Sequence, residues 1–255
     1  MKDIAPKVED ANRDSCLTYR IAPLVFTSAT RHGLIFLDLM RNRYSGLVRC
    51  DALTLSKYVD GIPAVDSSLG ECSESNTKDA ALLDALVAAG VLTRAPTATR
   101  EIVSTPVPLN GPLTSIGDEI AGTPDVNAWQ IAVFLIYLIS SAVALRLLPL
   151  RHVVRVVHRK RLAALAKGYK FNVSRAADLV ATFRGIRPYF FLPKDKCLLH
   201  ALTLTRYLAH HGEFPVWVLG VKTDPWAAHS WVQQEDFLLD CNPEKVCHLE
   251  QILGI

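Results

Sequence analysis

The 255-residue sequence predicts an α+β protein with two parts, a winged-helix-like N-terminal domain and a C-terminal domain in which a helix packs on an antiparallel sheet. Two observations lead to this prediction. Strand-like segments precede helix-like segments in the first 95 residues, whereas the last sixty residues contain one helical pattern followed by short apolar strands. Half of the residues are hydrophobic and 21% are charged, so the chain can bury a core.

The first domain is expected to span residues 1–95. Its expected strands are 17–29 (interrupted by Pro23), 33–39 and 44–48, and Asn42 suits the hairpin turn before the third strand. Its expected helices are 53–59, ended by Gly61, and 78–89, which Asn76 or Thr77 would cap and Gly90 would end. A small sheet followed by helices is typical of a winged-helix-like module.

Residues 96–125 are expected to link the two domains. The stretch is rich in proline and glycine, which disfavour helices and sheet interiors. The charge balance also changes here, from −4 over residues 1–126 to +7 over residues 127–255. We therefore expect a second, separate domain over residues 126–255.

The second domain opens with an uncharged stretch, 126–145. By length it is a candidate membrane-spanning helix, but its polar residues and its isolation in the chain favour a helix in the core of a soluble domain. The next segment carries Arg151, Arg155 and Arg159 on one helical face. Such a face is usually solvated, and binding of a phosphate, a nucleotide or an acidic peptide is the alternative.

The residues that suit catalysis lie near the C-terminus. Cys197 falls in the first turn of a predicted helix, after the candidate cap Asp195, where free N–H groups and the helix dipole stabilise a thiolate. His229 and Asp240 fall on two successive predicted strands, where they can face each other across the ladder. A thiol, an imidazole and a carboxylate in this arrangement predict a cysteine nucleophile, a histidine base and an acid that orients the histidine.

Other functions receive little support from the composition. The six cysteines are scattered and form no CxxC pair, so we expect neither a disulfide framework nor a metal site, and we interpret Cys16, Cys50 and Cys72 as incidental thiols. A net charge of +3 gives no reason to expect nucleic-acid binding. Residues 1–6 lack the apolar core of a secretory signal, so a cytoplasmic location is expected.

The segments around the three catalytic candidates resemble the transglutaminase-like core of lasso peptide B proteins, the leader peptidases of lasso peptide biosynthesis. The resemblance rests on residues 197–204, on 219–221 and above all on Ala-His-Ser-Trp-Val at 228–232, close to the family's Ala-His-Ala-Trp-Val. It implies a papain-like fold in which Cys197 is the nucleophile, His229 the general base and Asp240 the orienting acid. The chain departs from the family at His200-Ala201, where members often carry Arg-Ser.

The first domain is similar to the PqqD-like leader-recognition modules of ribosomal peptide (RiPP) pathways. Such modules bind a leader peptide as an added strand at a sheet edge, and the strand 44–48 and the helix 78–89 are the candidates here. The resemblance implies a precursor peptide as substrate, a lasso cyclase as partner and a need for ATP, although the chain has no GxxxxGK[ST] phosphate loop. A transglutaminase-type acyl transferase and a non-catalytic peptide carrier are the alternatives.

Overall fold

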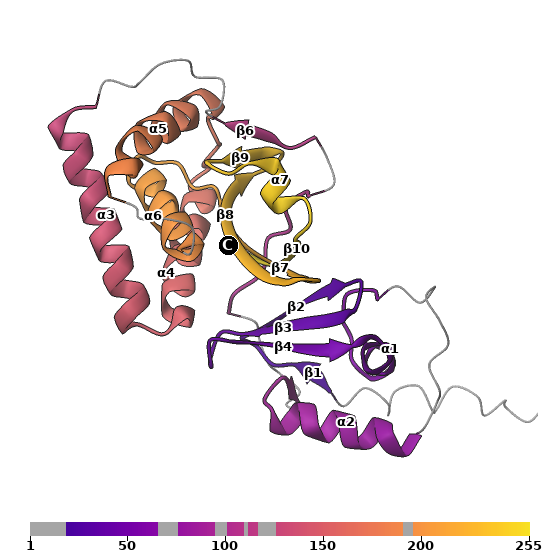
Figure 1. The fold of residues 1–255 in the computed structure, drawn as a ribbon. Coiled ribbons are helices and arrows are strands. Elements are labelled where there is room, and N and C mark those ends of the chain that lie inside the picture. The colour runs from indigo at the N-terminus through magenta and orange to yellow at the C-terminus, as the bar shows by residue number, and fades with distance from the viewer. Residues whose placement is uncertain (1–18, 66–75, 95–100, 110–111, 117–125, 191–195) are drawn as a thin grey trace, which may run out of the picture.

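The computed structural model describes residues 19–65, 76–94, 101–109, 112–116, 126–190 and 196–255. Within this part of the chain the strands form a three-stranded sheet, a two-stranded sheet and a five-stranded sheet (Figure 1). The N-terminal elements are β1 (Arg20–Ile21), β2 (Val25–Thr30), β3 (Gly33–Asp38), β4 (Arg43–Val48), α1 (Arg49–Tyr58), α2 (Asn76–Ala88) and β5 (Leu92–Thr93). The elements that follow are β6 (Thr114–Ile116), α3 (Ala128–Leu147), α4 (Leu150–Ala166), α5 (Val173–Ile186), the 3₁₀ turn η1 (Arg187–Tyr189), α6 (Cys197–His210), β7 (Val216–Thr223), β8 (Trp226–Gln234), β9 (Phe237–Leu239), α7 (Pro243–Val246) and β10 (Glu250–Gly254).

The N-terminal elements follow the predicted order. β2, β3 and β4 form an antiparallel meander, and Asn42 takes the left-handed conformation expected of a hairpin turn, with a φ of 50°. α2 is followed by Gly90, whose φ of +73° suits the end of a helix. α1 packs against β3 and β4, and α2 packs against α1 and β5. An antiparallel sheet followed by two helices is therefore present, and the winged-helix-like, PqqD-like identity stays a prediction.

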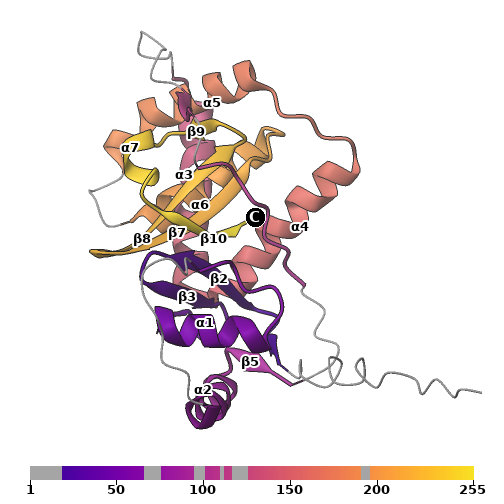
Figure 2. The same ribbon diagram turned by 90° about the vertical axis from the view of Figure 1, so that its right-hand side faces the viewer.

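The two parts of the chain are not separate objects, because the three-stranded sheet contributes to both hydrophobic cores. Along β3, Leu34 and Phe36 face the core shared with α1 and α2. The alternate residues Ile35 and Leu37 face the core that α6 and the five-stranded sheet build. β2 accordingly lies beside β10 and β7 (Figures 1 and 2). The first sheet is thus a layer between the N-terminal helices and the C-terminal domain.

The segment expected to be a linker is partly built into the C-terminal sheet. Ile102 is fully buried, and the Thr105 N–H donates to the Gly254 carbonyl at 2.7 Å. β6, which lies in this segment, pairs in parallel with β9 at the edge of the sheet. The boundary at residue 126 therefore does not mark where the C-terminal fold begins. Proline and glycine excluded helices here, but they did not exclude an edge strand.

The five-stranded sheet has the order β10-β7-β8-β9-β6. The predicted strands are present as β7, β8 and β9, which form an antiparallel meander, and β10 adds an edge that was not predicted. α6 packs on one face of this sheet, and α3 and α5 pack on α6 (Figure 1). The helix that carries Cys197 is therefore held between the sheet and two other helices.

The apolar helix at 126–145 is present as α3, and it begins with a capping box between Asn127 and Gln130. One face packs on α6, but the opposite face leaves Ile136, Ile139 and Leu147 exposed. The interpretation as a buried core helix is therefore only partly right. By length and composition alone α3 is the one helix in the described chain that could cross a membrane, which is weak evidence for a span.

Two further expectations change. The arginines of α4 bind elements of the N-terminal half, because Arg155 and Arg159 both bond the Glu101 carboxylate, at 2.6 and 3.0 Å. Two arginines of the basic face are thus paired with one carboxylate, although the Arg159 side chain stays 70% exposed. Cys50, interpreted as an incidental thiol, is disulfide-bonded, whereas Cys16 and Cys72 lie outside the described residues.

Candidate functional site

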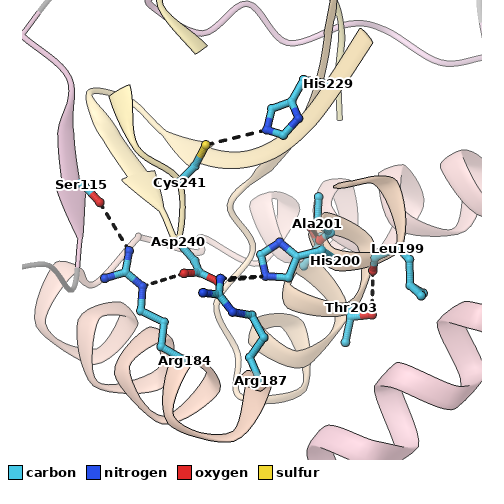
Figure 3. A network of polar contacts seen from close by, with 11 residues as sticks. Ser115, Arg184, Arg187, Leu199, His200, Ala201, Thr203, His229, Asp240 and Cys241 are labelled. Carbon is cyan, nitrogen blue, oxygen red and sulfur yellow. Dashed lines mark hydrogen bonds and ion pairs between the residues drawn. The ribbon is translucent and has the colours of Figure 1, made fainter. Parts of the chain in front are cut away.

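A pocket of about 610 Å³ brings all three predicted catalytic residues together. It lies between the N-terminus of α6, β8 and the end of β9, and Cys197, His229 and Asp240 all line it. Its basic lining residues are Arg184, Arg187, Lys196 and Lys245. Figure 3 shows the polar contacts of Asp240 and of His229, two of these lining residues.

Cys197 is the first residue of α6 and a free cysteine, as predicted. The helix has no side-chain cap at Lys196, and its first backbone bond runs from the His200 N–H to the Lys196 carbonyl. The N–H groups of the first turn, including that of Cys197, therefore have no partner within the helix and can bind an anion. The predicted cap, Asp195, lies outside the described residues.

Asp240 is held by two arginines and a histidine, and not by His229. Arg184 Nε donates to one carboxylate oxygen at 2.6 Å, Arg187 Nη1 donates to the other at 2.7 Å, and His200 Nε2 lies 2.9 Å from that second oxygen (Figure 3). The carboxylate side chain is only 3% exposed. Burial on its own would raise the pKa of Asp240, but the hydrogen bond and charge of His200 and the two guanidinium groups lower it below the ordinary value. Asp240 is ionised at neutral pH.

His200 is the functional candidate that sequence reasoning missed. It lies one helical turn after Cys197 on α6, so the two side chains emerge on the same side of the helix. The sequence contained a signal, since His200 stands where family members often have arginine, but only the fold brings Asp240 to it. This imidazole has the carboxylate partner that was assigned to His229.

His229 lines the same pocket from β8 but has different neighbours. Its ring stacks on Trp231 with centroids 6.3 Å apart, and its Nε2 lies 3.9 Å from Cys241 Sγ. Burial, then the positive charge of Lys245 and that of His200, lower the pKa of His229 below the ordinary value. The imidazole is therefore neutral at pH 7, the form that can accept a proton.

The predicted contact between His229 and Asp240 is not formed in this structure, because each side chain has other partners. The His229 ring stacks on Trp231, and its Nε2 lies beside Cys241 Sγ. Asp240, directly after β9, takes a left-handed φ of 60°. With this backbone conformation, the Asp240 carboxylate binds Arg184 of α5, Arg187 of η1 and His200 of α6. The next residue, Cys241, lies beside His229 instead.

The second thiol of the pocket is poorly suited to attack. Burial raises the pKa of Cys241 to about 11, so this thiol stays protonated near neutral pH. Its sulfur also contacts the Asn242 carbonyl at 3.7 Å. Cys197, at the open end of a helix, is therefore the better nucleophile. Within the described ranges, no cluster of three or more His, Cys, Asp or Glu residues could hold a metal ion.

No hydrogen bond joins Cys197 to either histidine among the residues that the structure describes. Catalytic hydrogen bonds are often long before substrate binds, so this geometry does not remove either imidazole as a partner. The pocket contains the groups that acyl transfer through a thioester requires: a thiol, a neutral imidazole and unpaired N–H groups at a helix start.

Residues 135–253 match the model of the Transglutaminase-like superfamily. The match runs from within α3 to within β10, so it includes α6, the central strands and every residue of the pocket. No curated protein and no solved structure matches the chain. The C-terminal part is thus a transglutaminase-like domain, a fold consistent with a cysteine peptidase or an acyl transferase.

Proposed function

We propose that the protein is a cysteine peptidase that binds the leader of a ribosomally made precursor peptide and cleaves it from the core during lasso peptide maturation. The observation that carries the proposal is Cys197 at the first turn of α6, in a pocket with two histidines and a buried carboxylate, inside a transglutaminase-like domain. The sequence resemblance supplies the substrate class. A lasso cyclase would receive the freed core.

In the proposed reaction, the Cys197 thiol gives its proton to a neutral imidazole and its sulfur attacks the carbonyl carbon at the end of the leader. The C–S bond forms as the C=O π electrons move to oxygen, and the N–H groups at the start of α6 stabilise that oxyanion. The C–N bond then breaks, the imidazolium returns the proton to the departing amine, and water hydrolyses the thioester.

We assign the proton transfer to His229. His200 is already bound to the Asp240 carboxylate, which Arg184 and Arg187 also bind. His229 is free of that network, and the low pKa caused mainly by its burial keeps it neutral. Asp240 would then act indirectly, since it fixes His200 and the two arginines that form the opposite wall of the pocket.

The leader would bind at the free edge of β4. Within the described chain β4 pairs only with β3, so its other edge offers unpaired backbone groups for an added strand. β4 begins beside β8, because Tyr44 packs on Trp226 at the start of that strand, which also carries His229. A leader that runs antiparallel to β4 would direct its C-terminal end toward β8. Binding there would raise the effective concentration of the scissile bond.

Mass spectrometry of a precursor peptide incubated with the full-length protein tests the proposal. We expect wild-type protein to release leader and core as two products, and Cys197→Ala to release neither. Cys247→Ala is the matched control, because Cys247 is an exposed free thiol that does not line the pocket, and this variant should cleave normally.

The same experiment separates the two alternatives. A crosslinked product that has lost ammonia would identify a transglutaminase, because an amine would then have intercepted the thioester instead of water. Unaltered precursor that binds equally to wild type and Cys197→Ala would identify a peptide carrier. Either result would refute the peptidase assignment.

A further inference from the structure

The pocket around the nucleophile carries an excess of positive charge. Its permanent cations are Arg184, Arg187, Lys196 and Lys245, whereas Asp240 is the only acidic residue among the described lining residues. The Asp240 carboxylate already binds both arginines, at 2.6 and 2.7 Å. The charges of the two lysines are therefore left over after the ion pairs inside the pocket have formed.

Lys196 and Lys245 have no ionic partner within the part of the chain that the structure describes. Both residues are exposed, and neither ammonium group forms a hydrogen bond or an ion pair with another described residue. A solvated lysine is common on a protein surface, but these two line the same pocket as the Cys197 thiol. Both charges are therefore available to a ligand that enters the pocket.

The backbone at both lysines is held in place. Lys196 directly precedes Cys197 and is the N-cap residue of α6. Lys245 lies on α7, whose start is capped by the Asn242 side chain and whose last residue, Val246, is fully buried. The two lysines therefore line the pocket from two different elements, and one of them is next to the nucleophile.

An anionic ligand complements this pocket. A cleft lined mainly by one sign of charge raises the local concentration of ligands of the opposite sign. In a peptide substrate, the anions that can lie next to the scissile bond are the side chains of aspartate and glutamate. A lysine ammonium is a compact point charge on a flexible stem, which suits a single carboxylate whose exact position varies.

We propose that the pocket selects substrates with an aspartate or a glutamate next to the scissile bond, and that Lys196 and Lys245 bind its carboxylate. This inference rests on the proposed peptidase function, and it adds the chemical class of the substrate. The lysines act in recognition alone, because the proposed covalent steps use the thiol, an imidazole and backbone N–H groups.

The test alkylates Cys197 in the full-length protein with two reagents that differ in charge. Iodoacetate carries a carboxylate, iodoacetamide is its neutral amide, and the sulfur displaces iodide from both. The rate of the matching Cys197→Ala protein is subtracted, which removes the reactions of the other cysteines. The ratio of the two rates measures the attraction of the carboxylate, because a change in the thiolate fraction of Cys197 affects both reagents equally.

We expect Lys196→Gln and Lys245→Gln each to lower the ratio of the iodoacetate rate to the iodoacetamide rate by about threefold, the contribution of one exposed ion pair. The double variant should lower it by about tenfold, and added salt should lower the wild-type ratio because it screens exposed charges. Lys170→Gln is the matched control, since Lys170 is an exposed lysine that does not line the pocket, and it should leave the ratio unchanged. An unchanged ratio in the double variant, or equal slowing of both reagents, would overturn the proposal.

Leader cleavage provides the second measurement. Replacing the Asp and Glu residues that flank the scissile bond of the precursor with Asn and Gln should raise KM by about tenfold and leave kcat within about twofold, because the carboxylate is bound and not transformed. Cleavage at a bond with no acidic residue beside it would overturn the assigned substrate class. A protein that shows the charge preference at Cys197 but cleaves no precursor would refute only the peptidase assignment.

Discussion

The two histidines of the pocket illustrate how differently one site can hold the same side chain. His200, on the helix, bonds a buried carboxylate that also binds two arginines. His229, on the strand, has an aromatic ring and a thiol as neighbours and no ionic partner among the described residues. The contact with Asp240 therefore holds the His200 imidazole in place, whereas the His229 imidazole is available to accept and return a proton.

His200 and His229 differ in their partners because the arginines of the pocket gather around Asp240 and not around His229. Asp240 lies where α5, η1 and α6 converge, so helical side chains surround its carboxylate. β8 presents His229 beside Trp231 and Cys241. A carboxylate that stabilises the pocket wall is thus separate from the imidazole that we expect to transfer the proton. The following changes test that separation.

Replacing each histidine should give unequal losses. General acid–base catalysis contributes about 10²–10⁴-fold, so we expect His229→Ala to lower kcat for leader cleavage by about 10³-fold. His200→Ala removes one of three contacts to Asp240 and should lower kcat by about tenfold. Single-turnover cleavage rates measure both effects, and urea unfolding verifies that each variant is folded. The opposite order of losses would assign proton transfer to His200.

Asp240→Asn should lower the free energy of unfolding by about 3 kcal/mol, the usual cost of breaking a buried ion pair. Because the pKa of Asp240 is lowered in the folded protein, its ionic stabilisation is present at neutral pH and is lost as the pH falls through that folded-state pKa. Urea unfolding at pH 7 and at acidic pH should therefore show a gap between wild type and variant that shrinks in acid.

Glu101→Gln is the matched control for that change. Glu101 also binds two arginines, Arg155 and Arg159, but its side chain is 41% exposed, against 3% for Asp240. Solvent screening should reduce its effect to about 0.5 kcal/mol. If Glu101→Gln and Asp240→Asn lowered the free energy of unfolding equally, burial would not explain the strength of the Asp240 ion pairs.

Much of the fold could be predicted from the sequence, because the signals were local. The hairpin turn at Asn42, the end of α2 at Gly90 and the start of α6 at Cys197 all depend on residues close in the chain. β6 and β10 were missed because each pairs with a strand that is not its neighbour in sequence. Short edge strands carry too few residues for a clear alternating pattern.

The site was harder to predict, because it depends on the direction of individual side chains. That Cys197, His229 and Asp240 share a pocket followed from the order of the helix and strands. Which histidine meets Asp240 depends on a left-handed φ at Asp240 itself, a conformation that aspartate adopts only occasionally. Nothing in the local sequence requires that turn, so the pairing with His200 could not be read from it.

The smallest expected effect concerns Cys241, whose sulfur is the nearest neighbour of His229 Nε2 in the described contacts. If His229 serves Cys197 and not Cys241, then Cys241→Ala should leave the rate of leader cleavage within about threefold of wild type, since the substitution removes a thiol that the reaction does not use.

The pKa of Cys241, which burial raises to about 11, allows a second and independent measurement on this thiol. Only the thiolate reacts with iodoacetamide, so labelling of Cys241, followed by peptide mass mapping, should rise continuously from pH 7 toward pH 11. Rapid labelling of Cys241 at pH 7, together with loss of cleavage in Cys241→Ala, would make Cys241 the partner of His229 and would transfer the nucleophilic role away from the helix start.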